Sequence, residues 1–496
     1  MENVMFDKKF ITSVLPDAQI LCDFFPSDFV FSIDTRTLKV GDIFIAFQGQ
    51  STDGHNYIVE ALDKGAAGLI INNSRQDLLN KIDKDLLKEK FILLVHDTYQ
   101  ALYKLAKAWR TKFDYPVVGI TGSVGKTSTR EMVTNVLSLQ KKSFVATSGN
   151  YCSLIGLALS ILRMRDHHEV GVFEIGISKR GEMGQAVDIL RPTIAAITSV
   201  GHSHMEGLGS LQDIANEKRL IFKYFKADSV GIVNGDQSYL SDIGYMHPVI
   251  KFGAKSTNQV QARKIRINSD QITFLLKLYR NKYAVRLQSS HEGRVVNALA
   301  AASICYLLHV DEQVIVDGVQ LPITIGSRFE FLPLKGGNGF VINDCYNASP
   351  ESVKAALLAI DHIKTKAYKV AVLGDMLELG VDSSFWHRQI GRFLRKTPSI
   401  QEVFLVGKWI RAAQILIPAG IKVTLVENLK EISDFVHTLA QRELLILIKA
   451  SHGMNLDVVV DEIAQRPISF AGAKKVSEDL LVQHDMQIVN NEQKLS

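Results

Sequence analysis

The stretch Val117-Val-Gly-Ile-Thr-Gly-Ser-Val-Gly-Lys-Thr-Ser-Thr-Arg130 decides how the rest of the chain is interpreted. A short apolar run is followed by a glycine-rich turn, by Lys126-Thr127 and by a segment that can form a helix. This order is typical of a phosphate-binding loop, because free backbone N–H groups and the positive end of a helix then face an anion. We expect Lys126 to reach the terminal phosphates of a nucleotide and the Thr127 hydroxyl to bind Mg²⁺.

The loop departs by one position from the common pattern G-x-x-x-x-G-K-[ST]. Ile120 stands where the first glycine belongs, between Gly119 and Gly122. Two interpretations follow: a nucleotide site of a different subfamily, or a glycine-rich turn with a solvated lysine. The order Gly-Lys-Thr-Ser directly after an apolar run favours the nucleotide site.

Composition narrows the class of protein. A chain of 496 residues, with 46% hydrophobic and 22% charged residues, indicates a globular protein of several domains. No apolar run approaches the roughly 20 residues that cross a bilayer, and the start lacks a basic segment followed by an apolar one. Four scattered cysteines indicate free thiols. We therefore expect a cytoplasmic protein without membrane insertion.

The charge pattern gives no sign of a nucleic-acid partner. The net charge is only +5, and the sequence has no dense stripe of lysine and arginine with interleaved aromatic residues. We expect small-molecule substrates and a monomer.

Apolar strands alternate with helical stretches along the chain, which predicts an α/β protein of three domains. Residues 1–112 form a small α/β domain, and residues 113–319 form a central domain whose parallel sheet carries the phosphate loop and has helices on both faces. Within it, short antiparallel strands are expected over about 249–292. Residues 320–470 form a doubly wound α/β domain, and the polar tail 471–496 is expected to be disordered.

Ligands of parallel sheets bind at the carboxyl ends of the strands. Besides the phosphate loop, Glu174 and His204 lie at or after predicted strand ends of the central domain. Glu174 stands inside an apolar strand, where a carboxylate needs a cation. That cation is either Mg²⁺, which pairs carboxylates with substrate phosphates, or a neighbouring lysine. His204 is either a solvated loop histidine or part of the same site.

Lys218 breaks the pattern of a predicted helix over Leu211–Phe222. It falls within the apolar stripe, whereas Asp213, Glu217 and Arg219 are expected on the solvated face. One interpretation is a lysine whose stem packs while its ammonium group reaches water. The other is an amine held neutral by burial, which can add CO₂ and become a carbamate ligand for a metal.

The C-terminal domain has its own polar strand ends. Asp344 ends a predicted strand, and it contacts a ribose or caps a turn. Gly374-Asp375 and Lys449-Ala-Ser451 follow two other strands of the same domain.

Five motifs together resemble one family, the Mur ligases, which are ATP-dependent, amide-forming enzymes of peptidoglycan precursor synthesis. The nucleotide loop of that family has the form T-G-[ST]-x-G-K-T, which accounts for the unusual spacing. The motifs that match are Thr121-Gly-Ser-Val-Gly-Lys-Thr127, Asp34-Thr-Arg36 with Asp53-Gly-His55, His204-Met-Glu-Gly-Leu-Gly-Ser210, Asn343-Asp-Cys-Tyr-Asn-Ala-Ser-Pro350 and Gly374-Asp-Met-Leu-Glu-Leu-Gly380. The resemblance covers nearly the whole chain apart from the tail, and it favours the type that adds D-alanyl-D-alanine to UDP-N-acetylmuramoyl-tripeptide.

The resemblance implies a set of site residues. ATP would be held by Thr121, Gly122, Ser123, Val124, Gly125, Lys126, Thr127 and Ser128, with Asn297 facing the adenine and Arg328 and Asp344 closing over phosphate and ribose. Thr127 and Glu174 would bind one Mg²⁺, and His204 and carbamylated Lys218 would serve a second. Substrate contacts would come from Thr35, Arg36, Asp53, His55, Asn150, Asn347, Lys449 and Ser451. The residues expected to act in catalysis are Lys126, Lys218 and His204.

The implied reaction begins when a peptide carboxylate attacks the γ-phosphate of ATP, which gives an acyl phosphate and ADP. The amine of D-alanyl-D-alanine then displaces phosphate. The chain departs from the family pattern at Cys152, Ser153, Ser178, Leu220, around Gly293 and at His452. A related ligase that adds a different amine, or a catalytically silent nucleotide-binding paralogue, are therefore the alternatives. The third residue of the tripeptide, diaminopimelate or lysine, is left open.

Overall fold

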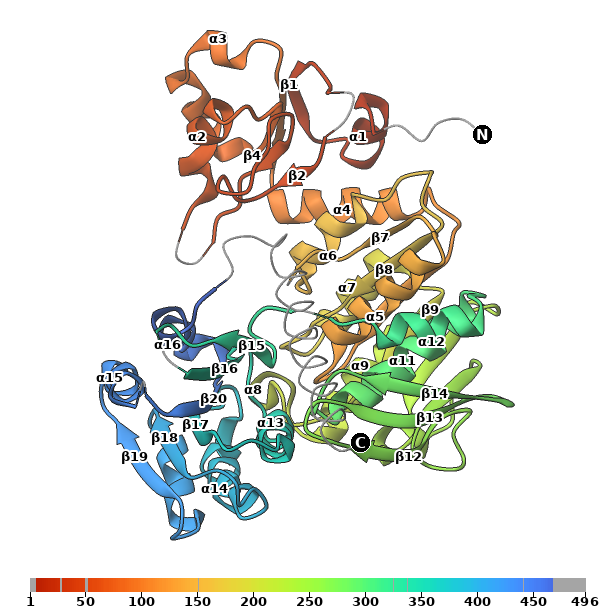
Figure 1. Ribbon diagram of the computed structural model, residues 1–496. Helices are drawn as coiled ribbons and strands as arrows, with labels where there is room; N and C mark the ends of the chain where they lie inside the picture. Colours follow the sequence, from red (N-terminus) through yellow and green to blue (C-terminus); the bar gives the residue numbers. More distant parts are fainter. Residues whose placement is uncertain are drawn as a thin grey trace, which may run out of the picture. The chain divides into compact units, whose positions relative to one another are not determined.

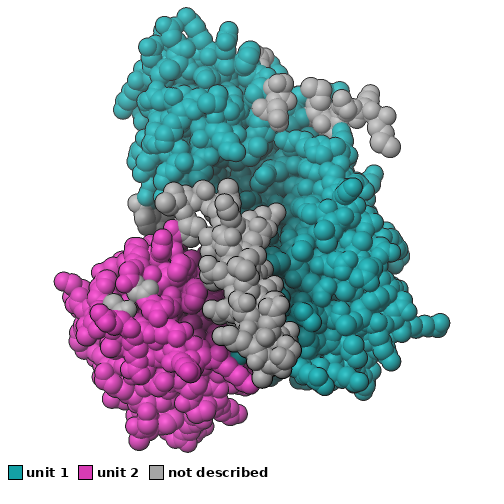
Figure 2. Space-filling view, in the orientation of Figure 1, with its two compact units in different colours: residues 1–323 teal, residues 324–496 magenta. Residues whose placement is uncertain are grey.

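The computed structural model describes residues 6–26, 29–49, 52–149, 151–323, 325–336, 338–439 and 441–466, so the expected tail 471–496 lies outside the described residues. The chain divides into two compact units between residues 323 and 324 (Figure 2). Strands and helices alternate through both units (Figure 1), which confirms the predicted α/β class. No helix among the described residues is long and apolar enough to span a membrane.

The first unit begins with a five-stranded sheet in the order β1-β5-β4-β3-β2. Its strands are β1 (Gln19–Asp23), β2 (Phe31–Ser32), β3 (Ile43–Ile45), β4 (Gly68–Asn72) and β5 (Phe91–Val95). All neighbours are parallel except β1, which pairs antiparallel with β5 at the edge. The helices are α1 (Lys8–Val14), α2 (Ile58–Asp63), α3 (Lys84–Leu87) and α4 (Thr98–Arg110).

Helix α4 joins this sheet to the central sheet. Asp97 caps its N-terminus by accepting hydrogen bonds from the backbone N–H groups of Tyr99 and Gln100. Its apolar side, including Leu102, Leu105 and Trp109, belongs to one buried cluster that also holds residues of the central sheet. At the last turn of α4, the buried guanidinium of Arg110 donates to the backbone carbonyls of Leu190, Phe113 and Arg191.

The central sheet has nine strands in the order β14-β13-β12-β11-β10-β9-β6-β8-β7. Its strands are β6 (Val117–Thr121), β7 (Phe144–Ala146), β8 (Val170–Glu174), β9 (Ile194–Ile197), β10 (Val230–Asn234), β11 (Val249–Gly253), β12 (Val260–Ile267), β13 (Ile272–Leu278) and β14 (Asn281–Leu287). The strands predicted around Glu174 and the phosphate loop are thus present and adjacent, because β6 lies between β8 and β9.

One prediction for this region is wrong in part. Short antiparallel strands were expected over about 249–292, but β11 is parallel to β10 and β12 is parallel to β11. Only β12, β13 and β14 pair antiparallel, and they extend the central sheet at its edge. Alternating side chains on these strands indicated the strands themselves, but strand direction depends on the connections in space.

Helices cover both faces of the central sheet, as predicted. On β9, Ala195 and Ile197 belong to one core cluster, and Ile194 and Ala196 to the other. The first face carries α6 (Leu154–Ile161), α7 (Glu182–Leu190) and α9 (Leu211–Arg219), and the second carries α5 (Lys126–Leu139), α11 (Gly293–Leu307) and α12 (Glu312–Gln320). Two short helices, α8 (Met205–Leu208) and α10 (Ser238–Ser241), follow β9 and β10.

The second unit is built on a six-stranded sheet in the order β15-β16-β20-β17-β18-β19. Its elements are β15 (Glu330–Pro333), β16 (Asn338–Asp344), α13 (Pro350–His362), β17 (Tyr368–Gly374), α14 (Ser383–Leu394), β18 (Glu402–Val406), β19 (Lys422–Val426), α15 (Lys430–Thr438), β20 (Glu443–Lys449) and α16 (Asp457–Ile463). All pairs are parallel except β15 with β16. The carboxyl ends of β16, β17, β18 and β20 therefore lie at one edge.

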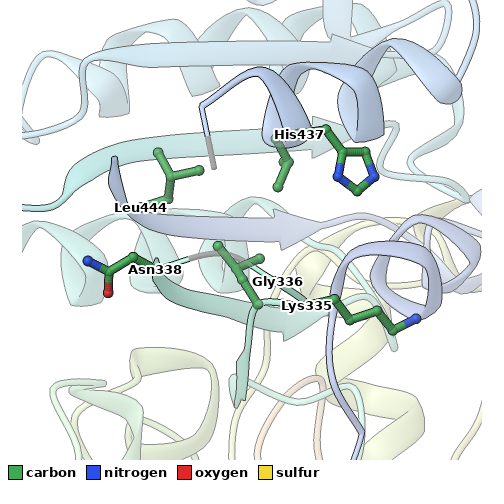
Figure 3. A pocket seen from close by; sticks show the side chains of 7 residues that line it. Lys335, Gly336, Asn338, His437 and Leu444 are labelled. Carbon is green, nitrogen blue, oxygen red and sulfur yellow. The ribbon is translucent and has the colours of Figure 1, made fainter. Parts of the chain in front are cut away.

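A small hollow lies at the opposite edge of this sheet, beside the start of β16 and β20 (Figure 3). Leu334, Val436 and Leu444 give it an apolar lining, and Lys335 stands at its rim. The Lys335 ammonium group donates to the backbone carbonyls of Asp461 and Glu462 at the end of α16. The hollow is thus separate from the strand ends that carry the predicted site residues.

Removal of the Trp109 side chain tests the shared core at α4. Trp109 is 1% exposed, and its indole N–H donates to the Met164 carbonyl at 3.1 Å. We expect Trp109→Ala to lower the free energy of unfolding by about 3–5 kcal/mol. Trp409→Ala is the control, because Trp409 is 41% exposed, and it should change stability by no more than about 0.5 kcal/mol. Urea unfolding followed by circular dichroism measures both; equal effects would contradict the shared core.

Candidate functional site

The turn between β6 and α5 requires glycine at two positions. Gly125 has φ +90°, and a Cβ there would lie 2.3 Å from Asn297 Oδ1. Gly122 has φ +155°, and its Cβ would lie 1.9 Å from Thr198 Oγ1. Both conformation and space therefore exclude a side chain. The backbone can approach its neighbours closely, and the N-terminus of α5 opens toward the carboxyl edge of the sheet.

The segment after β9 holds this turn in place. Thr198 Oγ1 donates to the Val124 carbonyl at 2.6 Å, and the Val124 N–H donates to Ser199 Oγ at 3.0 Å. Ser123 N–H donates to the Ser199 carbonyl at 2.9 Å. The roles of Thr198 and Ser199 were not predicted, because the turn that they hold is more than 70 residues away in the chain. Two hydroxyl side chains at the end of an apolar strand were the available signal.

Lys126, Thr127 and Glu174 come together as expected. The Lys126 ammonium group donates to the Gly122 carbonyl at 2.8 Å, so it lies over the turn. The Thr127 hydroxyl donates to Glu174 Oε1 at 2.9 Å, and both side chains are 1% exposed. Thr121 ends β6 and donates to the Ile175 carbonyl, while Ser128 lies in the first turn of α5. The phosphate loop and the carboxylate of β8 therefore share one edge.

The second carboxylate oxygen fits a bound cation. Glu174 Oε2 is buried and makes no hydrogen bond among the described residues. Its cationic neighbour is Arg130, with Nε at 4.0 Å, and not a lysine. Among the described residues, no group of three or more histidine, cysteine, aspartate or glutamate side chains could hold a metal. The Thr127 hydroxyl and the Glu174 carboxylate suit Mg²⁺, which takes one or two carboxylates and fills its other positions with phosphate and water oxygens.

Lys218 is buried on α9, as its position in the apolar stripe predicted. Its side chain is 2% exposed, and burial, together with the positive charge of Lys126, lowers its pKa well below the ordinary value. The expectation for Glu217 was wrong. Glu217 is 8% exposed and accepts hydrogen bonds from the backbone N–H groups of Gly181 and Met183, at the N-terminus of α7.

Two further predicted residues belong to the same unit. His204 lies at the N-cap of α8 with φ +58°, after the segment that holds the phosphate turn. Asn297 is buried in α11, and its amide oxygen faces Gly125. The structure thus brings Asn297 to the turn and leaves His204 on the loop that follows β9. Asn150 lies outside the described residues.

The predicted residues of the N-terminal sheet lie after β2 and β3. Arg36 is exposed and forms a bidentate pair with Asp34, which lowers the pKa of Asp34. Thr35 between them is buried, and its carbonyl accepts a hydrogen bond from Lys64 at 3.0 Å. This part of the site is polar and open on the side of Arg36.

Asp53 and His55 form a second pair on the same sheet. The Asn72 backbone N–H donates to His55 Nε2 at 3.0 Å, so Nδ1 carries the proton and donates to Asp53 at 2.7 Å. The other carboxylate oxygen of Asp53 pairs with Arg75. Sequence analysis missed Arg75, because its partner lies 22 residues away in the chain.

In the second unit, Asp344 and Lys449 stand opposite each other at the ends of β16 and β20. Their charged atoms are 2.6 Å apart, and the Lys449 ammonium group also donates to the Asn347 carbonyl at 2.9 Å. Burial raises the pKa of Asp344, and Lys449 opposes this shift. Three predicted residues thus form one cluster.

Arg328 and Ser451 lie near this cluster by their contacts. The Arg328 guanidinium stacks 3.8 Å from the centre of the Tyr346 ring, and its Nε is buried without a hydrogen bond among the described residues. Ser451 Oγ accepts a hydrogen bond from the Leu377 N–H at 2.9 Å. Asp375 accepts from three backbone N–H groups, those of Lys408, Trp409 and Ile410, so its role is to hold a loop.

Comparison with known proteins identifies the family. The chain matches the family model of the Mur ligase middle domain over residues 120–305, and that of the Mur ligase glutamate ligase domain over residues 327–452. It is 32% identical over 439 residues to a UDP-N-acetylmuramoyl-tripeptide–D-alanyl-D-alanine ligase of Bacillus subtilis (strain 168), a match that covers 88% of this chain and 93% of that protein. The chain belongs to the Mur ligase family, which confirms the resemblance found in the sequence.

Solved structures agree with this assignment. MurF from Acinetobacter baumannii matches with a TM-score of 0.78 and 25% identity, over 93% of this chain and 99% of that one. MurF from Thermotoga maritima in complex with ADP matches with a TM-score of 0.71 and 25% identity, over 89% of this chain and 98% of that one.

A methyl group at Gly125 tests whether the turn forms the nucleotide site. An alanine at this left-handed position costs about 1–3 kcal/mol, and its Cβ would meet Asn297. We therefore expect Gly125→Ala to weaken binding of a non-hydrolysable ATP analogue by at least about tenfold, measured by titration calorimetry. Gly184→Ala in α7 is the control, because nothing lies within 4 Å of its Cβ. Unchanged affinity in Gly125→Ala would contradict the assignment.

Proposed function

We propose that this chain is the ligase that joins D-alanyl-D-alanine to UDP-N-acetylmuramoyl-tripeptide, with ATP converted to ADP and phosphate, in peptidoglycan precursor synthesis. The observation that carries the proposal is the set of residues gathered at the carboxyl edge of the central sheet. There, the phosphate turn, Thr127, Glu174 and Lys218 lie on neighbouring elements of a chain related to enzymes of that name over most of its length.

Positioning and electrostatics account for the chemistry. The tripeptide carboxylate and the γ-phosphate are both anions, so their approach needs concentrated positive charge. Lys126 and the N-terminus of α5 supply it from one side. The turn keeps its N–H groups fixed because Thr198 and Ser199 hold it. No side chain has to act as a nucleophile: the acyl phosphate forms directly between the substrates, and the dipeptide amine then displaces phosphate.

Mg²⁺ is part of the proposal. Thr127 and Glu174 would hold one ion, and His204 and Lys218 would serve a second. The bound ions would neutralise charge on the β- and γ-phosphates during transfer. The orphaned Glu174 Oε2 supports the first site, since a buried carboxylate oxygen without a donor needs a cation.

Lys218 would serve the second ion as a carbamate. Its amine is buried, and its lowered pKa favours the neutral form that reacts with CO₂. Addition joins the neutral amine nitrogen to the carbon of CO₂ and releases one proton, which leaves an anionic oxygen ligand in place of a neutral amine.

The three sheets suggest where each reactant binds. We assign the UDP part of the precursor to residues 1–112, through Thr35, Arg36, Asp53 and His55. ATP is assigned to residues 113–319, with Asn297 toward the adenine. The third part, residues 320–470, would bring Arg328 and Asp344 to the phosphate and ribose, and Asn347, Lys449 and Ser451 to the dipeptide. Asn150 would contact the tripeptide.

We further propose that the enzyme acts in the cytoplasm as a monomer. Each of the motifs assigned above lies on one chain, and its substrates, ATP and a UDP-linked precursor, are soluble. Sedimentation of the active enzyme tests the monomer, and cell fractionation tests the compartment.

A phosphate-release assay tests the reaction. With MgCl₂, ATP, UDP-N-acetylmuramoyl-tripeptide and D-alanyl-D-alanine, we expect turnover that falls to background when either substrate is omitted. Lys126→Ala should abolish it, since the γ-phosphate loses its cation. Replacing the dipeptide by other amines, and comparing tripeptides that end in diaminopimelate or lysine, defines specificity. Turnover with a different amine, or ATP binding without any turnover, would overturn the assignment.

Substitution of Lys218 tests the carbamate. We expect Lys218→Ala to lower kcat on the order of 100-fold, the usual loss when one group that stabilises transition-state charge is removed. Lys226→Ala, at an exposed lysine of the same unit, should leave kcat unchanged. A crystal structure grown with bicarbonate should show density for CO₂ on the Lys218 nitrogen; an unmodified ammonium group that contacts only solvent would contradict the idea.

A further inference from the structure

The helix that follows the phosphate turn carries a buried arginine, Arg130, to which the proposed reaction gives no role. Arg130 lies on α5, one turn after Lys126, and is 3% exposed. Its guanidinium reaches three elements. One terminal nitrogen donates to the Thr147 carbonyl after β7, the other pairs with Glu131 on α5 itself, and Nε lies 4.0 Å from Glu174 Oε2 at the end of β8.

Arg130 and Glu174 lie close together but form no hydrogen bond with each other. Nε of Arg130 and Oε2 of Glu174 are both buried, and neither makes a hydrogen bond among the described residues. Buried polar atoms are usually satisfied, so two unsatisfied atoms of opposite charge that face each other require an explanation. A distance of 4.0 Å is too long for a hydrogen bond but short enough for strong charge attraction in a buried place.

The other contacts of both residues explain why they do not close this gap. Glu174 is held by Thr127 at Oε1, and its backbone N–H donates to Thr147 Oγ1 at 3.0 Å. Arg130 is held by the Thr147 carbonyl and by Glu131. Thr147 therefore contacts both residues and fixes their separation, which leaves Oε2 without a hydrogen bond among the described residues.

We propose that Arg130 is a positioning residue that balances the charge of Glu174 while no metal ion is bound and keeps Oε2 free to receive one. This inference rests on the metal role proposed for Glu174. A hydrogen bond from Arg130 would occupy Oε2 and compete with the ion. A neutral residue would leave a buried carboxylate without any cation, at a high cost in stability. An arginine that Thr147 holds at a distance neither competes with the ion for Oε2 nor leaves the carboxylate without a cation.

A purely structural role is the alternative, in which Arg130 only ties the end of β7 to α5 through the Thr147 carbonyl. The chain offers a matched control for this role. Arg110 is also a buried arginine that donates to backbone carbonyls, but among the described residues its guanidinium forms no ion pair with a carboxylate. Loss of a structural guanidinium should have the same consequence at either site, whereas loss of a counter-charge should respond to Mg²⁺ at position 130 only.

The test compares thermal unfolding of the full chain in EDTA and in excess MgCl₂ at matched ionic strength. We expect Arg130→Met to melt lower than the wild type in EDTA and to recover in MgCl₂, so that its Mg²⁺-dependent rise in Tm is about twice that of the wild type or more. Arg110→Met should melt lower by the same amount in both buffers. Equal Mg²⁺-dependent rises in the wild type and both variants would overturn the proposal.

Two further variants keep the test decisive where Arg130→Met folds poorly. Arg130→Lys keeps the positive charge, so its Mg²⁺-dependent rise should stay close to that of the wild type. In a Glu174→Gln background, which removes the negative charge, Arg130→Lys and Arg130→Met should show the same Mg²⁺-dependent rise in Tm, because the contacts of position 130 with Glu131 and Thr147 do not depend on Mg²⁺. A larger rise for Arg130→Met there would show that Glu174 is not the partner. These melting experiments need no turnover, so they are independent of whether the ligase reaction itself is found.

Discussion

The close approach of two glycines to their neighbours is the constraint on which the rest of the central site depends. Gly122 and Gly125 leave no room for a Cβ against Thr198 and Asn297, so the turn after β6 lies directly against the segment after β9 and against α11. Once the turn is fixed, the first residues of α5 must lie beside the end of β8, and Thr127 meets Glu174. Lys126 then lies over the turn, and the positive field reaches Lys218 on α9. The steric requirement for glycine in this turn thus determines where Lys126 and Glu174 lie.

Charge is placed on all three sheets by the same rule, that carboxyl ends of parallel strands meet at one edge. What differs is the partner. On the N-terminal sheet, Asp53 lies between His55 and Arg75, so the carboxylate is fully paired. On the C-terminal sheet, Lys449 pairs with Asp344 across adjacent strands. Among the described residues, only the central sheet has a buried carboxylate oxygen without a hydrogen bond at such an edge.

The sequence predicted the site residues that are charged but stand within apolar segments. Glu174 in an apolar strand and Lys218 in an apolar stripe could be found because burial of a charge is costly and therefore informative. Glu217 was placed on the solvated face, because the N-terminus of α7 that it caps is 34 residues away in the chain. Arg75, Thr198 and Arg130 were missed for the same reason: their roles come from partners that only the fold supplies. The strand that ends near Glu174 was predicted, but the parallel direction of β11 depended on its neighbours in the sheet.

Arg110 has a consequence of a different kind. It binds the end of α4 to the end of α7 entirely through backbone carbonyls, which are acceptors at any pH. Burial lowers the pKa of Arg110, but the ordinary pKa of an arginine is so high that the guanidinium keeps its proton near neutral pH. Neither side of this connection can therefore be switched off by acid. The connection between α4 and α7 is therefore retained at pH values where a connection made from carboxylates or histidines would titrate.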